Sequence, residues 1–548
     1  MKLTMIPLSS LTKVFPDEKP SAAPFVSASC LKNEVFSFQV AVCNALDPED
    51  AVRFRKLAAS VESDLPVSLR LVGLEPVELP TYPQAAAEVP QEYLRTAPGM
   101  FPDPLLPVED ELRLTLNQWH SLWVTVDGRR GLPVGEHTVA VRITDQDGNV
   151  QTCEFRLNVL PAELPEQKLL YTEWFHCDCI ASRYGVEMQS EKHWELIEKY
   201  AKTAAENGIN MLLTPIITPA LDTAVGTERP TMQLVRIDVD ENGYRFDFSL
   251  LDRWFAMCDR AGIRYYEIAH LFSQWGAECA PKVMGWKNGA YVRLFGWETP
   301  ALSDEYVGFL NAFLPALVAH LKDAGRFERC YFHLSDEPSL DHAEHYMACR
   351  RVLTPYLPEE RLMDALSNVE FWDRGIVKLP IPANNHIAPF LERKISPLWT
   401  YYCCGQTVGV ANKFLAHPGA STRIIGAQMF KYNVTGFLQW GYNFWYSALS
   451  KTKIDPWRTA NGNCDWPAGD PFAVYPGEDG PIESMRLVQM HEAIQDMGAM
   501  ELLEEKLGHD AVVAMIDEGI EPLRFDCFPR CEDYLLRLRE RVNAALCK

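Results

Sequence analysis

The stretch DEYVGFLNAFLPALVAHLKDAGRFERCYFHLSDEPSLDHAEHYMACRRVL, residues 304–353, contains two alternating hydrophobic patterns. Apolar residues recur at helical spacing over Asp304–Ala324 and again over Ala343–Leu353, and a short apolar run, Cys330–Leu334, lies between them. A strand flanked by two helices is the repeating unit of a parallel sheet that is covered by helices. The stretch therefore predicts an α/β fold.

The same alternation extends over roughly residues 168–510, where eight strand-like runs can be counted. The expected strands are Leu169–Phe175, Ile209–Pro215, Tyr265–Leu271, Cys330–Leu334, Leu362–Leu366, Ile381–Ile387, Leu398–Tyr402 and Gly436–Trp440. Further helices are expected at Glu191–Asn207, Leu250–Ala261 and Ser484–Leu507. Eight such units predict a (β/α)8 barrel of the TIM type.

The first 160 residues have a different texture, with short β-rich runs between turn signals. Strands are expected at Val35–Cys43, Val67–Leu74, Ser121–Val126, His137–Ile143 and Cys153–Leu160. The segment DQDGN, residues 145–149, predicts a hairpin turn between the last two. We therefore predict an N-terminal antiparallel β-sandwich over residues 1–164, a catalytic barrel over 165–510 and a C-terminal helical tail over 511–548.

Composition and charge narrow the classes of partner. The chain has 548 residues, 47% of them hydrophobic, and a formal net charge of -22. Such a field repels polyanions, so neither nucleic acid nor a membrane surface is expected as a partner. The N-terminus lacks the continuous apolar core of a signal peptide, and no stretch reaches the ~18 apolar residues of a spanning helix. Together with 15 scattered cysteines, expected to be reduced, these features predict a cytoplasmic protein.

The strongest chemical signal is YFHLSDEPSL, residues 331–340, where an apolar strand ends in Ser335, Asp336 and Glu337. Active sites of such barrels lie at the carboxyl ends of the strands. Two neighbouring carboxylates there would repel each other, raise at least one pKa and so keep one group protonated as a general acid. The alternative interpretation is a helix N-cap, because carboxylates also favour that position.

Other strand ends favour the chemical interpretation, because they combine aromatic rings with amide, imidazole and carboxylate groups. The candidate residues are Trp174, His176, Asp178, His270, Gln274, Trp275, Tyr401, Tyr402, Trp440 and Asn443. Sugars need this mixture, since their C–H faces stack on rings and their hydroxyls form hydrogen bonds. The long segment 213–239 adds Asp222 and Arg229, which either reach the site or pair within a small hairpin.

The sequence predicts no metal and no cofactor. His176 and His333 could bind a metal together with Asp178 and Asp336, but no recognised ligand spacing is present. His333 is expected to be a hydrogen-bonded histidine inside the barrel or beside the substrate. No nucleophile elbow, P-loop or dinucleotide-binding glycine motif occurs, so serine hydrolases and nucleotide-binding enzymes are excluded.

With these residues assembled, the chain resembles glycoside hydrolase family 123, whose characterised members are β-N-acetylgalactosaminidases. The resemblance spans most of the chain. It is carried by KNEVFSFQVAV (32–42), PGMFPDPLLP (98–107), YFHLSDEPSL, PLWTYYCCG (397–405), YNVTGFLQWGYNFW (432–445), DPW (455–457) and VYPGEDGPIESMRLVQMHEAIQDMGAMELLEE (474–505).

The resemblance implies an exo-acting β-N-acetylgalactosaminidase that retains anomeric configuration with the help of its substrate. The sugar's own 2-acetamido carbonyl attacks the anomeric carbon and forms an oxazolinium-like intermediate, an exception to the usual pair of carboxylates across the scissile bond. Carried over by motif, Glu337 is the general acid and base, and Asp336 accepts the acetamide N–H. Tyr402, Trp440, Asn443 and Tyr475 lie in matching segments and are assigned to substrate contact.

Two alternatives stay open. One is a carbohydrate-binding protein on a barrel that has lost catalysis. The other is a glycosidase for a sugar without an acetamido group, which would need a separate nucleophile, with Glu173 or Asp178 as candidates. In each case the expected partner is a carbohydrate.

Overall fold

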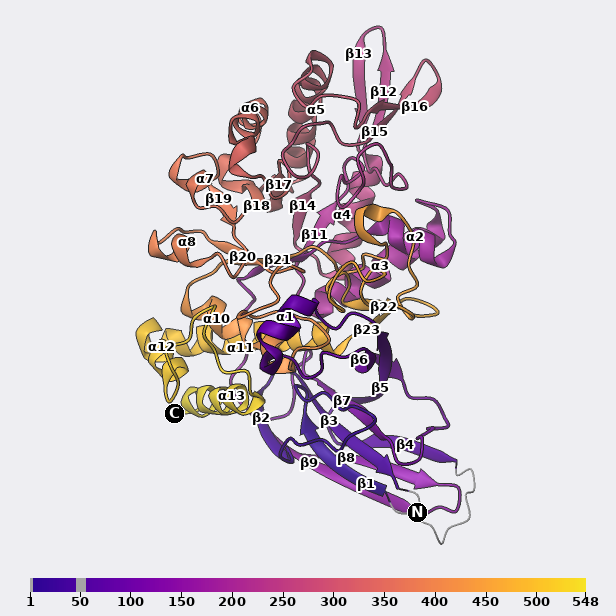
Figure 1. Cartoon of the computed structure of the whole chain (residues 1–548), viewed down its shortest axis with the longest axis vertical. Helices are drawn as coiled ribbons and strands as arrows, with labels where there is room; N and C mark the ends of the chain where they lie inside the picture. Colours follow the sequence, from indigo (N-terminus) through magenta and orange to yellow (C-terminus); the bar gives the residue numbers. More distant parts are fainter. Residues whose placement is uncertain (1–2, 46–55) are drawn as a thin grey trace.

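The computed structural model describes residues 3–45 and 56–548. The molecule is elongated, with β-sheets of the N-terminal region at one end, a barrel in the middle and a small additional sheet at the far end (Figure 1). The long helix α11 lies between the N-terminal sheets and the barrel.

Two sheets pack face to face in the N-terminal region. One has the strand order β1-β3-β7-β5-β6 and the other β2-β9-β8-β4. The strands are β1 (Leu3–Ser9), β2 (Ser27–Leu31), β3 (Val35–Asn44), β4 (Leu57–Glu62), β5 (Val67–Val77), β6 (Gly99–Pro107), β7 (Trp119–Asp127), β8 (Gly135–Asp145) and β9 (Val150–Leu160). Phe38 of β3 stacks on Phe155 of β9 at 4.2 Å between ring centroids, which joins the sheets.

The predicted sandwich is therefore confirmed, with one local difference. All neighbouring strands run antiparallel except β2 and β9, which pair in parallel. The predicted hairpin turn joins β8 to β9, and Gly148 takes the positive φ of 82° that favours glycine there.

Eight parallel strands form the barrel, in the order β19-β18-β17-β14-β11-β10-β21-β20. They are β10 (Leu170–Glu173), β11 (Met211–Thr214), β14 (Tyr265–Ile268), β17 (Cys330–His333), β18 (Leu362–Ala365), β19 (Leu379–Ile381), β20 (Trp399–Tyr401) and β21 (Gly436–Gln439). A single parallel bridge, Ala383 to Tyr401, closes the ring between β19 and β20. The predicted barrel is confirmed.

The sixth strand differs most from its prediction. The structure ends β19 at Ile381, whereas the sequence pattern placed a strand over Ile381–Ile387. Pro382 follows directly and has no N–H for a ladder bond, although its carbonyl accepts from Tyr401 N–H at 3.1 Å. The residues beyond it lead into the short helix α8 (Ala388–Glu392).

Helices cover the outside of the barrel, and the five predicted from the sequence (α3, α4, α5, α6 and α11) have nearly the expected bounds. They are α2 (Cys177–Tyr184), α3 (Glu191–Glu206), α4 (Ser249–Ala261), α5 (Asp304–Asp323), α6 (Ala343–Leu353), α7 (Glu370–Asp373), α9 (Gly419–Arg423), α10 (Ile425–Lys431) and α11 (Met485–Leu507). Ser190, Ser303 and Ser484 cap α3, α5 and α11 by accepting a backbone N–H three residues on.

A second, four-stranded sheet is inserted into the barrel loops. Its order is β13-β12-β15-β16, with β12 (Arg236–Asp240), β13 (Gly243–Asp247), β15 (Val283–Lys287) and β16 (Ala290–Phe295). Phe246 of β13 packs on Phe309 and Phe313 of α5. The insertion follows β11 and β14, so it extends the walls above the strand ends.

A buried charged cluster connects the sandwich to the barrel. Arg486 of α11 donates from Nε and Nη2 to the carboxylate of Asp103 in β6, at 3.0 and 2.8 Å. Tyr475, in β22 (Val474–Pro476), donates its hydroxyl to the same carboxylate at 2.6 Å. The side chains of Asp103 and Arg486 are fully buried, so each balances the charge of the other where water cannot reach.

The C-terminal helices pack onto the rest of the molecule. They are α12 (His509–Asp517) and α13 (Glu532–Leu546). Asn543 of α13 donates to the Ser29 carbonyl of β2 at 3.1 Å, and Arg539 pairs with Glu34 and Asp496. The predicted helices are therefore present, and α13 is anchored to the sandwich. The predicted boundaries at residues 164 and 510 stay predictions.

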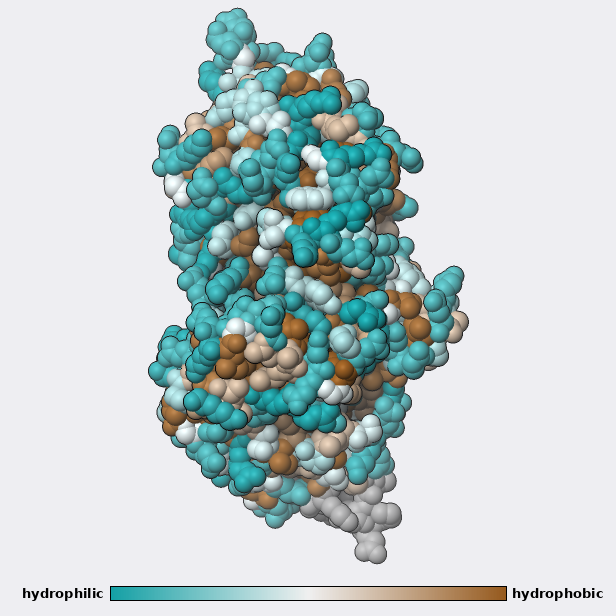
Figure 2. Space-filling view, turned by 90° about the vertical axis from the view of Figure 1, so that its left-hand side faces the viewer, coloured by the Kyte–Doolittle hydropathy of each residue, from teal (hydrophilic) through white to brown (hydrophobic). Residues whose placement is uncertain are grey.

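The remaining short elements are α1 (Pro83–Glu88) and β23 (Pro481–Glu483), which pairs with β22. All 15 cysteines, which lie within the described ranges, are free thiols. On the face in Figure 2, hydrophilic residues predominate and apolar ones are scattered among them. Within the described residues, no helix combines the length and apolarity that crossing a bilayer requires.

Candidate active site

A cavity of about 690 Å³, including its open mouth, lies at the carboxyl ends of the barrel strands. Its wall combines three carboxyl groups with several aromatic rings. The lining residues are Trp174, His176, Leu221, Asp222, Trp275, Asp336, Glu337, Ala365, Tyr401, Cys403, Cys404, Leu438, Trp440, Phe444 and Trp466. Eight of the candidate residues from the sequence are among them: Trp174, His176, Asp222, Trp275, Asp336, Glu337, Tyr401 and Trp440.

Asp336 and Glu337 follow β17 directly and are fixed through their backbone. The Asp336 carbonyl accepts from Trp275 N–H at 2.8 Å, and Glu337 N–H donates to the Ala365 carbonyl at 3.1 Å. Glu337 has a φ of +41°, and Asp222 and Trp275 also have positive φ. Positive φ is costly for residues other than glycine, and such strain clusters at functional sites. Three strained residues around one cavity therefore mark it as a functional site.

The carboxyl pair lies in an environment that favours protonation. Burial raises the pKa of Asp336 well above its usual range, and the neighbouring Glu337 carboxylate raises it further. Burial also raises the pKa of Asp222 to about 6. Burial and the adjacent carboxylate therefore both favour the protonated form of Asp336.

Tyr401 makes the direct side-chain contact to this pair. Its hydroxyl donates to Glu337 Oε1 at 2.5 Å. Trp399 and Tyr401 of β20 both face the barrel interior, because side chains alternate along a strand. The next residue, Tyr402, points outward and packs on Phe437 at 4.9 Å. Tyr402 was the residue assigned to substrate contact, but it lies away from the cavity.

Aromatic residues from the loop after β21 and from residue 466 form one wall. The ring of Trp440 lies 5.0 Å from both Phe444 and Trp466. Its indole N–H donates to Asp470 at 2.8 Å, which fixes the ring plane. Trp275 lies at the rim with 45% of its surface exposed. This arrangement offers apolar faces of the kind on which sugar rings stack.

Arg229 lies behind the cavity lining, with its guanidinium 5.3 Å from the centre of the Phe444 ring. Its guanidinium donates to both oxygens of Asp178, at 3.0 and 2.6 Å, and to the Leu221 carbonyl at 3.3 Å. It also donates to His176 Nδ1 at 3.2 Å, which leaves Nε2–H to donate to the Trp440 carbonyl. Burial and the Arg229 charge lower the pKa of His176 to about 3, so His176 is neutral.

Segment 213–239 thus forms a wall of the cavity. Leu221 and Asp222 face it, and Asp222 Oδ2 accepts from Leu449 N–H at 2.9 Å. Arg229 pairs with Asp178, not with an aspartate of its own segment. The hairpin that the alternative interpretation expected begins only at Arg236.

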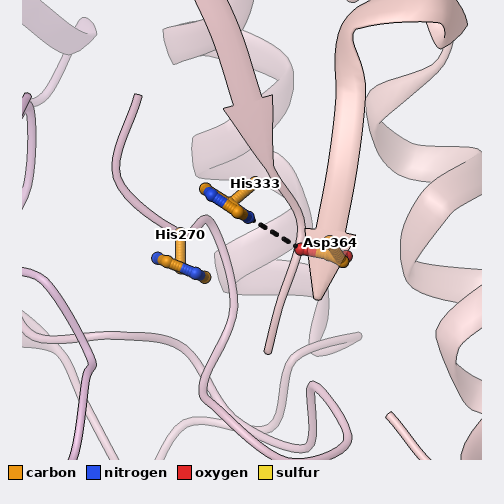
Figure 3. Close-up of side chains that lie close together, drawn as sticks. All are labelled: His270, His333 and Asp364. Atoms are coloured by element: carbon orange, nitrogen blue, oxygen red, sulfur yellow. Dashed lines mark hydrogen bonds and ion pairs between the residues drawn. The ribbon is translucent and has the colours of Figure 1, made fainter. Parts of the chain in front are cut away.

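A cluster of buried polar residues lies beneath the cavity, where β14, β17 and β18 end (Figure 3). His333 is hydrogen-bonded to Glu267 at 2.5 Å through Nε2 and to Asp364 at 3.1 Å through Nδ1. Trp174, in the cavity wall, donates its indole N–H to Glu267 at 2.7 Å. Burial opposes protonation of His333, but the two carboxylates outweigh it and raise its pKa to about 10. The indole ring of Trp174 thus connects this buried cluster to the cavity.

His270 belongs to this cluster. Its ring stacks on His333 at 4.1 Å, and neither of its nitrogens has a hydrogen-bond partner among the described residues. Burial and the His333 charge lower the pKa of His270 well below its usual range. Gln274 is also buried and donates to the Thr223 carbonyl at 3.1 Å. Neither residue is part of the cavity lining.

The other predicted residues position loops or domains. Asn443 bonds through its amide to the backbone N–H and carbonyl of His176, at 2.8 and 3.1 Å, and so fixes the loop after β10. Tyr475 is fully buried in the cluster with Asp103 and Arg486. Arg229 and His333 act on the cavity through the neighbours described above.

Other lining residues were missed from the sequence or not assigned a role. Tyr401 was a candidate, but Tyr402 was assigned to substrate contact in its place; strand alternation favours Tyr401, because Trp399 marks the inward-facing side chains of β20. Trp466 had no local signal, since it follows the turn-rich segment NGNCD and reaches the cavity only through the fold. Cys403 and Cys404 also line the cavity, and neither was among the predicted site residues.

A parallel eight-stranded barrel with two neighbouring carboxyl groups against an aromatic wall is the architecture of a glycoside hydrolase. Residues 174–503, more than half of the chain, match the catalytic domain of glycoside hydrolase family 123. The chain belongs to that family. No curated protein matches it in sequence.

A solved structure supports the fold. A family 123 glycoside hydrolase from Clostridium perfringens, described in connection with glycolipid glycan hydrolysis, is similar with a TM-score of 0.76 and 16% identity over 100% of this chain and 98% of that one. A putative glycoside hydrolase from Bacteroides vulgatus has a TM-score of 0.27 and 10% identity, covering 78% and 76% of the two chains. At 16% identity the similarity to the Clostridium perfringens enzyme concerns the fold alone, and the Bacteroides vulgatus structure is too dissimilar to support a conclusion.

Proposed function

We propose that this chain is an exo-acting β-N-acetylgalactosaminidase that uses the acetamido group of its substrate as nucleophile. The observation that carries the proposal is the unequal setting of the carboxyl groups. Asp336 and Glu337 lie side by side in the cavity, whereas the two candidates for a separate nucleophile lie outside its lining. Glu173 is paired with Lys413 at 3.2 Å, and Asp178 with Arg229 at 2.6 Å.

In the first step, the acetamide carbonyl oxygen attacks the anomeric carbon while the bond to the leaving oxygen breaks. Glu337 gives its proton to that oxygen, and Asp336 accepts the acetamide N–H as positive charge develops on the ring being formed. In the second step, water attacks the anomeric carbon, and Glu337 takes the proton released. The enzyme returns to its starting state and the sugar keeps its configuration.

Three features of the cavity support these roles. The raised pKa of Asp336 favours a proton within the carboxyl pair, and this proton passes to Glu337 when Asp336 accepts the acetamide N–H. The Tyr401 hydroxyl, hydrogen-bonded to Glu337, fixes the direction in which that carboxyl faces. Trp440, Phe444 and Trp466 offer a surface for the apolar face of the sugar. A glycan end carrying GalNAc, such as that of a glycolipid, is the proposed substrate class.

The decisive experiment compares an aryl β-N-acetylgalactosaminide with the matching aryl β-galactoside, with and without a thiazoline mimic of the oxazolinium ion. We expect cleavage of the first alone and its inhibition by the thiazoline. Equal cleavage of the galactoside would contradict substrate assistance and favour a separate nucleophile, for which Asp178→Ala and Asp222→Asn are the variants to compare. Calorimetric binding of GalNAc without cleavage would favour a carbohydrate-binding protein.

A further inference from the structure

The buried cluster beneath the cavity contains donor atoms that the proposed hydrolysis does not use. His270, His333 and Asp364 come from the ends of β14, β17 and β18, and each is at most 1% exposed. One donor atom from each lies within 4.8 Å of the other two. Figure 3 shows the two imidazole rings nearly parallel and on the same side of Asp364.

From this convergence we propose that His270, His333 and Asp364 bind one divalent transition-metal ion of the Zn²⁺ type beneath the active site. Two imidazoles and one carboxylate are a ligand set that Zn²⁺ accepts, with a fourth position left for water. A tetrahedral zinc site with bonds of about 2.0–2.1 Å needs donors about 3.3 Å apart. His333 Nδ1 and Asp364 Oδ1 already lie 3.1 Å apart.

His270 supplies the third ligand. A buried imidazole with both nitrogens unpaired is unusual, since buried polar groups are almost always hydrogen-bonded. The His270 ring lies nearly parallel to the His333 ring, so it must turn out of this stack to direct a nitrogen at the ion, and no hydrogen bond to a described residue opposes that turn. The ion takes the place of the proton between His333 Nδ1 and Asp364 Oδ1.

The surrounding residues orient these ligands in the way that groups around metal sites do. Glu267 accepts from His333 Nε2 at 2.5 Å, which directs Nδ1 toward the ion. Tyr346 donates to Asp364 Oδ2, which leaves Oδ1 to the ion. Two buried carboxylates, Glu267 and Asp364, supply the negative charge that a divalent cation requires.

The ion would join three strand ends directly below the catalytic pair. Trp174, in the cavity wall, is bonded to Glu267 and packs edge-on against His270 at 5.2 Å. Ser335 N–H donates to Asp364 at 3.2 Å and immediately precedes Asp336. The ion therefore has a structural role under the cavity, and the sugar chemistry proceeds without it.

The test treats the full chain with a chelator, removes the chelator and titrates with Zn²⁺, measuring stoichiometry by elemental analysis and affinity by calorimetry. We expect one equivalent per chain, a rise in melting temperature on binding, and the visible absorption of a four-coordinate ion when Co²⁺ replaces Zn²⁺. His270→Phe, which keeps a stacked ring, and Asp364→Asn should each weaken binding at least tenfold.

His417→Phe is the matched control, because His417 is equally buried but lies between Tyr93 and Phe414, beside Lys13. It should bind Zn²⁺ like the unchanged chain. Absence of a stoichiometric ion in the unchanged chain would overturn the proposal. So would binding that survives His270→Phe, which would assign the ion to exposed cysteines such as Cys464. Circular dichroism of each variant shows that it is folded, and His270→Asn repeats the test with a smaller side chain.

Discussion

The catalytic pair and the cluster that joins the sandwich to the barrel place carboxyl groups in opposite electrostatic settings. Asp103 meets the guanidinium of Arg486 and the hydroxyl of Tyr475, so its charge is fully compensated. Asp336 meets a second carboxyl group, Glu337, and its pKa rises through burial and that repulsion. The Asp103 carboxylate, paired with Arg486, stabilises the contact between sandwich and barrel. The Asp336 and Glu337 pair has no such cation, which favours a proton that can take part in catalysis.

The largest effect is expected from a substitution in the catalytic pair. Glu337→Gln removes the proton donor, and kcat on the aryl β-N-acetylgalactosaminide should fall by about 10²–10⁴-fold. The Glu337 side chain is exposed at the cavity, so the melting temperature should hardly change. Steady-state kinetics and a thermal melt measure both. Glu360→Gln, at an exposed position elsewhere, is the control; undiminished turnover in Glu337→Gln would refute the assigned role.

A substitution in the cluster that joins the sandwich to the barrel should lower the stability of the fold. Arg486→Met leaves the Asp103 carboxylate buried without its partner, and the free energy of unfolding should fall by about 3–5 kcal/mol. Urea denaturation followed by fluorescence measures the change. Arg458→Met, at an exposed site, should stay within about 0.5 kcal/mol of the unchanged chain. Equal midpoints for both variants would show that the cluster does not stabilise the fold.

A smaller effect separates the two neighbouring tyrosines. Tyr401→Phe removes the hydrogen bond to Glu337, and a bond to a charged group contributes about 1.5–3 kcal/mol, so kcat should fall by about 10- to 150-fold. Tyr402→Phe, outside the cavity, should leave kcat within about twofold. If Tyr402→Phe lowered kcat more than Tyr401→Phe, the inward-facing side chain of Tyr401 would not be the one that matters for catalysis.

The smallest effect concerns stability as a function of pH. Because the pKa of Asp336 is raised in the folded chain, the unfolded chain loses this proton first as pH rises above about 4, and stability falls with pH. Asp336→Asn removes that penalty. The variant should melt about 1–2 °C higher than the unchanged chain at pH 7 and show no such gain near pH 4. Calorimetric melts at both pH values test this, and a lower melting temperature at pH 7 would contradict it.

The sequence predicted the barrel because hydrophobic periodicity is a local property. Cys330–Leu334 and the helix Ala343–Leu353 could be located from the spacing of their own residues. The sequence also pointed to Asp336 and Glu337, because active sites of such barrels lie at the carboxyl ends of the strands and these residues directly follow a predicted strand. The N-cap alternative is not observed, because α6 begins six residues after Glu337.

Residues whose roles depend on long-range contacts could not be assigned in this way. Tyr475 lies in a motif segment but contacts Asp103, which is 372 positions away along the chain. His270 and Asp364 come together only where separate strands end, so no linear ligand spacing could reveal them. Trp466 is brought to the cavity by a loop without regular structure.

The closure of the barrel has a consequence for how the protein opens. Strands β11 and β14 share four paired residues, whereas β19 and β20 meet through the single bridge from Ala383 to Tyr401. Local opening begins where the fewest backbone hydrogen bonds must break. Amide hydrogens along β19 and β20 should therefore exchange with solvent deuterium before those of β14. The residue that orients Glu337 lies on this seam, so an inhibitor that fills the cavity should slow exchange there most.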